Sequence, residues 1–209
     1  MTAMHKRFSR RGWQAACWPL LAALALGSGC AKPFPEADPA ATAVVDALGP
    51  LDLADVARQV HDRVNAIRAR HGLSQLAWNA ELAAIATAHS IDMRKQRYFS
   101  HDAPDGTQVT DRYARAGYVC RAPNGPGRFL TGGENLALVH RVPRWRIWSD
   151  GRREAETVRT AAELAEETVQ GWWNSPGHKA NLLQPAWLTE AIGIAVTADG
   201  QVLITQNFC

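Results

Sequence analysis

The chain has 209 residues and a mass of 22.8 kDa, which is enough for one well-buried domain with additional segments but short for two. Hydrophobic residues make up 46% of the chain and charged residues 21%, a globular composition that excludes a disordered or collagen-like protein. Four basic residues and no acidic ones stand before position 30, so the rest of the chain is nearly neutral and nucleic acid is not an expected partner.

Residues 1–29 have the order of segments that is typical of an export signal. A basic stretch over 6–11 precedes a short apolar stretch over 13–26, and small residues follow up to Cys30. The apolar stretch is shorter than the roughly 20 residues that a bilayer-spanning helix needs, and no second such stretch follows. A cysteine directly after small residues resembles a bacterial lipoprotein site, although Gly27 stands where that pattern usually has Leu. We expect lipidation of Cys30, with cleavage by an ordinary signal peptidase nearby as the alternative.

The segment over 30–52 is rich in proline and small residues, and we expect it to form an extended tether. If Cys30 is acylated, this tether would hold the following domain away from the membrane surface. The sequence therefore predicts an exported protein of the cell envelope, in the outer membrane or the periplasm, anchored at Cys30 or else secreted.

A folded domain is expected over 53–209, and it begins with two amphipathic helices. Apolar residues at three- and four-residue steps predict a first helix that begins near Leu53 and ends before Gly72. Asn79 is expected to cap a second helix, with His89 among the apolar side chains of its inner face.

The second half of the domain is expected to contain further helices and a closing hairpin. The pattern predicts a short helix over 110–116, a glycine-rich loop over 121–133 and a long helix over 154–173. Ser175 and Pro176 are typical of the start of another short helix. Finally, two strands over 192–197 and 201–208 flank an Asp-Gly turn, which predicts a β-hairpin.

Two cysteines remain once the signal is removed and Cys30 is acylated, namely Cys120 and Cys209. In an oxidising compartment we expect them to form a disulfide, with two unpaired thiols as the alternative. Such a bridge would tie the last residue to the middle of the chain and would stabilise the fold by about 4 kcal/mol.

Several short motifs stand in a fixed order along residues 53–209. They are His71-Gly72-Leu73, Leu76-Ala77-Trp78-Asn79, Phe99-Ser100-His101, Gly133-Glu134-Asn135-Leu136-Ala137, the segment from Trp172 to Leu183, Thr189-Glu190, Ile192-Gly193-Ile194 and Gln206-Asn207-Phe208. Together they resemble the CAP superfamily, which includes cysteine-rich secretory proteins, antigen 5, pathogenesis-related one proteins and bacterial SCP-domain proteins. The resemblance implies an α+β fold, an α-β-α sandwich with a small antiparallel sheet between helical layers.

The family places two histidines and two glutamates in a central cleft. The resemblance assigns the first histidine to His101, one glutamate to Glu134 and the second histidine to His178. The second glutamate belongs three residues after Trp172, where this chain has Ser175. The cleft is therefore expected to lack one carboxylate, as in the bacterial branch of the family.

His101, Glu134 and His178 are the candidate catalytic and metal-binding residues. Two imidazoles and a carboxylate can hold a divalent metal such as zinc and leave a position for water. Without a metal, Glu134 could orient one histidine while the other acts as a general base. No nucleophile is evident, because Ser175 is better explained as the cap of a helix. A polar network that only braces the cleft is the structural alternative.

The other histidines are expected to have structural roles. His89 lies on the apolar face of its helix and is expected in the core, not at a metal site. His61 and His140 lie outside the motifs, and both of them and His71 are expected at the surface. Glu190 can either brace a helix or face the cleft, and the sequence does not choose between these.

The segment 140–153 combines five arginines with two tryptophans. It can be an interfacial patch for anionic lipid, lipopolysaccharide or a wall polymer, with tryptophan at the level of the headgroups. Alternatively it is a solvated loop whose tryptophans pack against the domain. Asp150, Glu154 and Glu156 reduce the local charge, which weakens the case for nucleic acid further.

Three functions fit this sequence. We favour an exported binding module, a monomer that holds a lipid-like or cell-envelope ligand, because the second glutamate and a nucleophile are missing. A metal-assisted hydrolase that uses His101, Glu134 and His178 is the first alternative. A structural envelope protein with an inert cleft is the second, and the fold by itself does not decide among the three.

Overall fold

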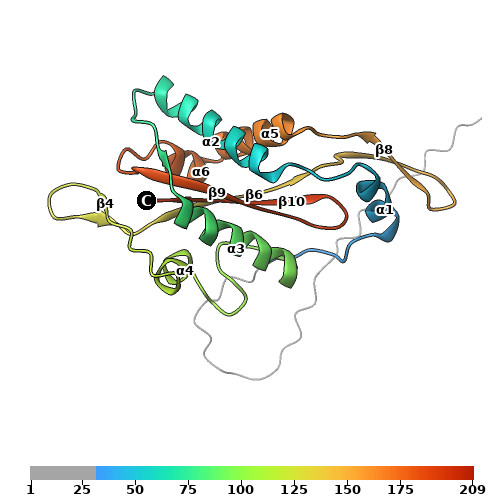
Figure 1. Cartoon of the computed structure of the whole chain (residues 1–209), viewed down its shortest axis with the longest axis horizontal. Coiled ribbons are helices and arrows are strands. Elements are labelled where there is room, and N and C mark those ends of the chain that lie inside the picture. The colour runs from blue at the N-terminus through green and yellow to red at the C-terminus, as the bar shows by residue number, and fades with distance from the viewer. Residues whose placement is uncertain (1–31) are drawn as a thin grey trace, which may run out of the picture.

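A four-stranded sheet forms the middle layer of the structure, a computed structural model that describes residues 32–209 (Figure 1). The strands follow one another in the order β2 (Ala77–Trp78), β9 (Thr189–Val196), β10 (Gln201–Phe208) and β6 (Gly133–His140). Strand β10 is antiparallel to both of its neighbours, β9 and β6, whereas β2 runs parallel to β9. The turn between β9 and β10 contains Gly200 at φ +84°, so the predicted hairpin is confirmed.

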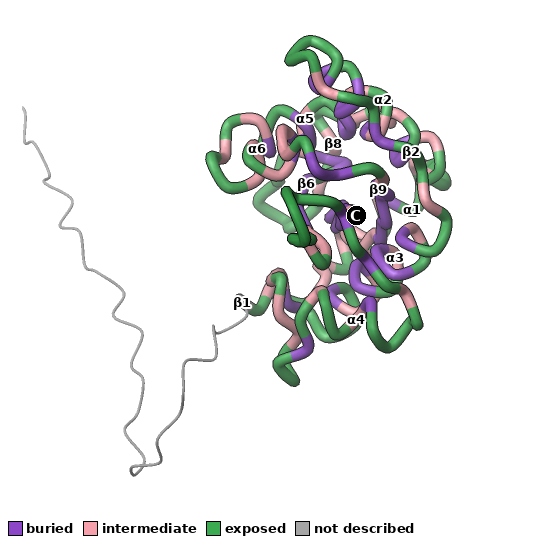
Figure 2. The backbone as a smooth tube through the Cα atoms, turned by 90° about the vertical axis from the view of Figure 1, so that its left-hand side faces the viewer, coloured by how far each residue is buried: buried purple, intermediate pink, exposed green. Residues whose placement is uncertain are grey.

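Helices cover both faces of this sheet (Figure 1). On one face, α3 (Ala80–Gln96) packs on β9 and β10, and α4 (Val109–Arg115) lies beyond it. On the other face, α2 (Leu53–Arg70) packs on β9, α5 (Ala161–Asn174) on β6, and α6 (Pro176–Leu182) follows α5. Buried residues line the inward sides of these elements (Figure 2). The predicted α-β-α sandwich is therefore confirmed.

Local sequence signals set the ends of the main helices. The Asp52 side chain accepts a hydrogen bond from Asp55 N at the start of α2, and Asn79 does the same for Leu82 N at the start of α3. Gly72, at φ +69°, directly follows the C-cap of α2. Packing of α3 on β9 also depends on Gly193, because a Cβ atom there would collide with the main chain of α3.

The long helix expected over 154–173 is shorter than predicted. Residues 153–157 instead form β8 (Arg153–Thr157), which pairs with β7 (Arg144–Ile147) in a separate hairpin. A capping box in which Thr160 and Glu163 bond each other's main chain begins α5 at Ala161. The correct signal for the helix start was therefore the Thr-x-x-Glu sequence and not the apolar spacing upstream of it.

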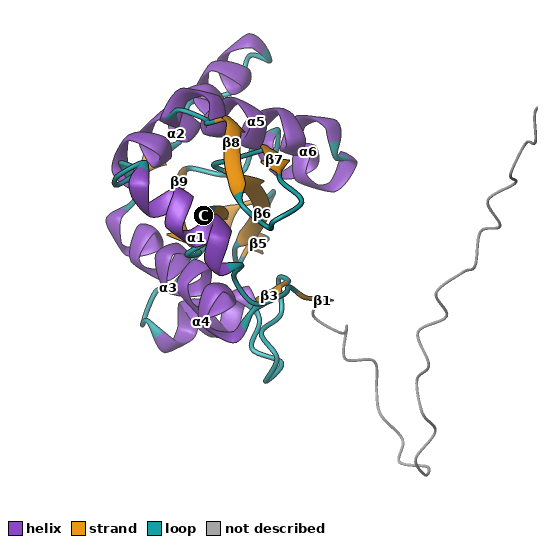
Figure 3. Cartoon of the chain, turned by 90° about the vertical axis from the view of Figure 1, so that its right-hand side faces the viewer, coloured by secondary structure: helices purple, strands orange, loops and turns teal. Residues whose placement is uncertain are grey.

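The structure also differs from the extended tether expected over 30–52. Asp38 accepts hydrogen bonds from Ala40 N and Ala41 N and begins α1 (Pro39–Ala47), whose Ala41 and Val45 are buried. Before it, β1 (Lys32–Pro33) pairs with β3 (Tyr98–Phe99). Figure 3 shows α1 on the same side of the molecule as the hairpin of β7 and β8. The predicted signal over 1–29 and Cys30 lie outside the described residues.

A disulfide joins Cys120 to Cys209, whose Cα atoms are 5.4 Å apart, as the sequence predicted. It connects the end of β10 to the segment that leads into the small hairpin of β4 (Ala122–Pro123) and β5 (Phe129–Leu130). Within residues 32–209 we find no helix that is both long and apolar enough to span a membrane.

Candidate functional site

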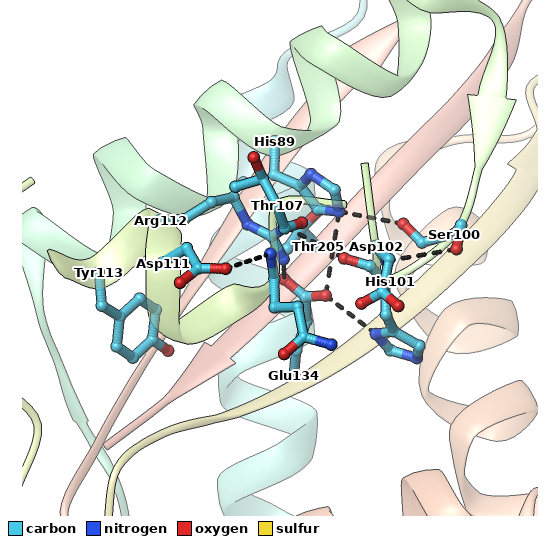
Figure 4. A network of polar contacts seen from close by, with 12 residues as sticks. His89, Ser100, His101, Asp102, Thr107, Asp111, Arg112, Tyr113, Glu134 and Thr205 are labelled. Carbon is cyan, nitrogen blue, oxygen red and sulfur yellow. Dashed lines mark hydrogen bonds and ion pairs between the residues drawn. The ribbon is translucent and has the colours of Figure 1, made fainter. Parts of the chain in front are cut away.

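Glu134 is the centre of the candidate site, near the start of the edge strand β6. Its side chain is only 2% exposed, and both carboxylate oxygens have partners (Figure 4). Oε1 is 2.9 Å from Nδ1 of His101, and Oε2 accepts a hydrogen bond from Nη2 of Arg112 at 2.6 Å. Glycines precede it because Gly132 has φ +136° and a Cβ on Gly133 would collide with the Trp187 ring.

Arg112 on α4 fixes the loop that carries His101. Its Nη1 donates to the carbonyl of His101 at 3.0 Å and to that of Thr107 at 3.2 Å, while its Nη2 is bonded to Glu134. Charge-assisted bonds of this kind are the stronger hydrogen bonds in proteins. Arg112 thus joins three segments into one unit: α4, the loop that follows β3, and the strand β6. No sequence motif singled out this arginine. The side chain of His101 itself is 52% exposed.

His178 approaches the same point from the other side of the strand. It stands on α6, and its ring centroid is 6.3 Å from that of His101. Burial, and to a smaller extent the charge of His101, lower the pKa of His178. The structure therefore brings together the three residues that the sequence predicted, His101, Glu134 and His178.

His89 borders this cluster from the inside. It is 1% exposed on α3, as expected for a core histidine, with Nε2 3.2 Å from the carbonyl of Ser100 and 3.9 Å from Glu134. Burial lowers its pKa. The predicted cap Ser175 does occupy the position before α6, but its side chain makes no capping hydrogen bond.

The cluster fits a metal only in part. Among residues 32–209, no three His, Cys, Asp or Glu side chains are arranged to hold a metal ion. Glu134 is engaged by His101 and Arg112, so it fits the role of an acceptor behind a histidine ligand and not that of a ligand. His101 and His178 would hold a divalent cation, which would supply Lewis-acid chemistry. Without a cation, the lowered pKa of His178 favours a neutral imidazole there, and this ring lies beside that of His101, which Glu134 orients.

A groove of about 520 Å³ adjoins the cluster between α3 and α4. Apolar side chains form much of its wall, while His89 and Arg112 belong both to the wall and to the neighbourhood of Glu134. The apolar members of the wall are Ala84, Ile85, Ala88, Ala103 and Ala116.

A second histidine–glutamate pair lies between α2 and the sheet. Nδ1 of His61 is 2.8 Å from Oε1 of Glu190, a residue of β9 that is completely buried. The expectation that His61 is a surface group is wrong, since its side chain is only 18% exposed, whereas His71 and His140 are exposed as expected. Glu190 faces α2, on the side of the sheet opposite to Glu134. The i, i+4 spacing of His61 and Asn65 was the available sequence signal for a polar cluster here.

The fold and the cluster agree with the comparison to known families. The model described as the cysteine-rich secretory protein family, CAP, matches residues 61–208. The chain therefore belongs to the CAP family, as the motifs predicted.

Two curated relatives come from Bacillus subtilis strain 168. The "Uncharacterized membrane protein YlbC" is 30% identical over 151 residues, which are 72% of this chain and 33% of that protein. The "Uncharacterized protein YkwD" is 28% identical over 151 residues, which are 72% of this chain and 46% of that protein. The chain thus matches less than half the length of either relative.

Solved structures give the same fold. An extracellular protein containing an SCP domain from Bacillus anthracis matches with a TM-score of 0.53 and 30% identity, over 77% of this chain and 44% of that one. An outer surface protein from Borrelia burgdorferi matches with a TM-score of 0.52, over 75% of this chain and 92% of that one. At 18% identity the second match shows the fold alone.

Proposed function

We propose that this chain is an exported CAP-domain protein that binds a lipid-like ligand in the groove between α3 and α4. The observation that carries the proposal is the joining of an apolar groove to a polar cluster with exposed and buried cationic groups. Ligand sites commonly combine apolar walls with a few convergent polar groups in this way.

The groove carries charges of both signs, and Arg115 is the group that can meet an anionic head on the ligand. Asp92 accepts a hydrogen bond from the hydroxyl of Tyr98 at 2.7 Å, and Asp105 accepts one from Thr107 N at 2.9 Å. Arg115 is exposed and makes no ion pair with another residue of the described chain. We therefore infer an acyl chain along the alanine-rich wall and a carboxylate or phosphate near Arg115.

Export and anchoring belong to the same proposal. One relative is named an uncharacterized membrane protein, one solved structure is that of an extracellular protein, and a disulfide is typical of an oxidising compartment. A signal over 1–29 and an acyl group on Cys30 are consistent with these points. A cell-envelope location, in the outer membrane or the periplasm, follows as part of the proposal.

A fluorescent fatty acid, cis-parinaric acid, tests the groove directly. Ala88 and Ala66 are both exposed helical alanines, but Ala88 lines this groove on α3 and Ala66 lines a different one between α2 and α5. Ala88→Trp fills the groove and should lower the affinity at least about tenfold, whereas Ala66→Trp should leave it unchanged. No binding by the unmodified protein, or equal losses in the two variants, would overturn the proposal and favour an inert cleft.

A metal-assisted hydrolase that uses His101, Glu134 and His178 is the second candidate. The bond from Glu134 to Nδ1 of His101 favours it, because such a bond orients an imidazole and raises its basicity. Hydrolysis of a p-nitrophenyl ester that is lost in His178→Ala and retained in His140→Gln, at the exposed end of β6, would support this candidate. Equal rates in the protein and in His178→Ala would exclude it.

A further inference from the structure

A hydrogen-bonded series of polar side chains, which we call the polar chain, crosses the sheet from His61 to the candidate site. Its charged member is Glu190 on β9, which is completely buried and has a partner on each oxygen. Nδ1 of His61 is 2.8 Å from Oε1, and Nε2 of Gln206 on β10 donates to Oε2. A buried carboxylate needs such partners, because an unpaired charge inside a protein is strongly unfavourable.

The same chain continues through two asparagines to the main chain of the cluster. Nδ2 of Asn135 donates to Oε1 of Gln206 at 2.9 Å and to the carbonyl of His178 at 3.3 Å. Nδ2 of Asn181 donates to Oδ1 of Asn135 at 2.9 Å and to the carbonyl of Glu134 at 3.1 Å. Two side chains of the polar chain therefore hold the main chain of the predicted site, Asn181 at Glu134 and Asn135 at His178.

All of these amides point their donors in one direction. Asn181 donates to Asn135, Asn135 donates to Gln206, and Gln206 donates to Glu190. Because the oxygen of an amide can only accept and its nitrogen can only donate, reversing one member would place like groups against each other at its neighbour. Hydrogen bonds in such a series polarise and strengthen one another. The carboxylate at the end therefore fixes the orientation of the whole series.

The opposite end of the chain is fixed as well. Asn65 accepts from Leu76 N at 2.7 Å and donates to Leu76 O at 3.0 Å, so its amide has one orientation. Its Nδ2 also lies 3.2 Å from Nε2 of His61, which must then accept. His61 consequently carries its proton on Nδ1 and donates to Glu190. Both oxygens of Glu190 must accept, which an amide in its place cannot do.

We propose that Glu190 is a positioning residue for the His101–Glu134–His178 cluster, acting through Gln206, Asn135 and Asn181 on the main chain of Glu134 and His178. This deepens the proposed function, on which it rests only for the role of the cluster. The position of the cluster itself can be read without any ligand. The competing explanation is that the polar chain supports the fold as a whole and does not act on the cluster in particular.

The test compares Glu190→Gln with Ser90→Ala by amide and imidazole NMR of the full exported protein. Ser90 is also buried against β9 and β10, where it bonds Gly193 O at 3.0 Å and Thr205 at 2.8 Å, but it lies on the opposite face and has no bond to the polar chain. Glu190→Gln should shift the amide resonances of residues 134, 135 and 178–181 and the ring resonances of His178. Ser90→Ala should lower the melting temperature and leave those resonances in place.

Asn135→Asp provides a second variant that keeps residue size and leaves Glu190 intact. It removes the donor to His178 O, so it should shift the same resonances, and adding Glu190→Gln to it should shift them little further. In both single variants the affinity for cis-parinaric acid should fall at least about fivefold. Shifts confined to the surroundings of His61, Glu190 and Gln206 would overturn the proposal, even if the protein binds no fatty acid.

Discussion

The two histidine–glutamate pairs of this protein have nearly the same geometry and differ in what surrounds them. In each, Nδ1 of a histidine lies close to Oε1 of a buried glutamate, at 2.9 Å for His101 and Glu134 and at 2.8 Å for His61 and Glu190. The ring of His101 is half exposed and has no second hydrogen bond within the described chain, whereas Nε2 of His61 is bonded to Asn65. Only the first pair keeps a nitrogen available to a ligand.

The two pairs also differ in the partner of the second carboxylate oxygen. Glu134 is neutralised by Arg112, while Glu190 has only the amide of Gln206 there. Burial raises the pKa of Glu190, against the opposing influence of His61, Gln206 and Arg68. A histidine–glutamate contact is therefore not evidence of a reactive site. The free nitrogen and the nearby cation are what make the first pair a candidate.

The largest expected effect is a difference in unfolding free energy between a variant of the buried pair and a variant of the cleft pair. Glu190→Ala leaves two buried donors without an acceptor and should reduce the free energy of unfolding by about 3–5 kcal/mol. His101→Ala removes a half-exposed ring and should change it by less than about 1 kcal/mol. Urea denaturation of both variants measures the difference. Similar losses in the two would show that the cleft pair is as structural as the buried one.

Zinc affinity tests whether the cleft pair, unlike the buried pair, belongs to a metal site. His178→Ala removes one of two available imidazoles and should abolish most of the zinc binding seen by titration calorimetry, and Glu134→Gln should weaken it about 10- to 100-fold. His89→Ala should reduce stability through lost packing and leave zinc binding intact. Binding should weaken at acidic pH, because imidazole must be neutral to bind. Equal affinities in the protein and in His178→Ala would end the metal hypothesis.

The pH dependence of stability gives the smallest effect. The pKa values of His89 and His178 are lowered in the folded state, chiefly by burial, so both residues bind a proton more weakly when the protein is folded. Their contribution to stability is complete above the unfolded pKa of about 6.5 and is lost as the pH falls below it. The raised pKa values of His61 and Glu190 act in the opposite direction, so the share of His89 is isolated by a variant. In urea denaturation at pH 7.5 and 5.0, His89→Gln should lose less stability on acidification than the protein does. His140→Gln, at the exposed end of β6, is the control and should leave the dependence unchanged.

Local signals in the sequence were sufficient for much of the fold. Asn79 at the start of α3, Gly72 after α2 and the Asp-Gly turn before β10 each act within a few residues, and each is where the sequence predicted it. The cluster of His101, Glu134 and His178 was predicted from motifs shared with the family and not from local helix or turn signals. In all these cases the information lies in neighbouring residues or in a pattern shared by a family.

The features that the sequence did not predict depend on contacts between segments of the chain, adjacent in one case and distant in two. The strand β8 exists because it pairs with β7, and apolar residues upstream of Thr160 imitate the spacing of a helix. Arg112 joins Glu134 across 22 residues, and His61 joins Glu190 across 129. No periodicity or composition reports such contacts. Both unpredicted pairs nevertheless involve charged residues that the structure buries.

The strand pairing of β1 has a consequence for how this domain would meet a membrane. Lys32 and Pro33 are paired with β3, and His101 follows that strand by two residues. Only Ala31 separates Cys30 from Lys32, so an acyl group on Cys30 would start within about 7 Å of this pairing. If Cys30 is acylated as proposed, so short a connection would hold β1 and β3 next to the bilayer and would leave the domain little freedom to rotate. The segment that carries His101 would then lie near the membrane surface.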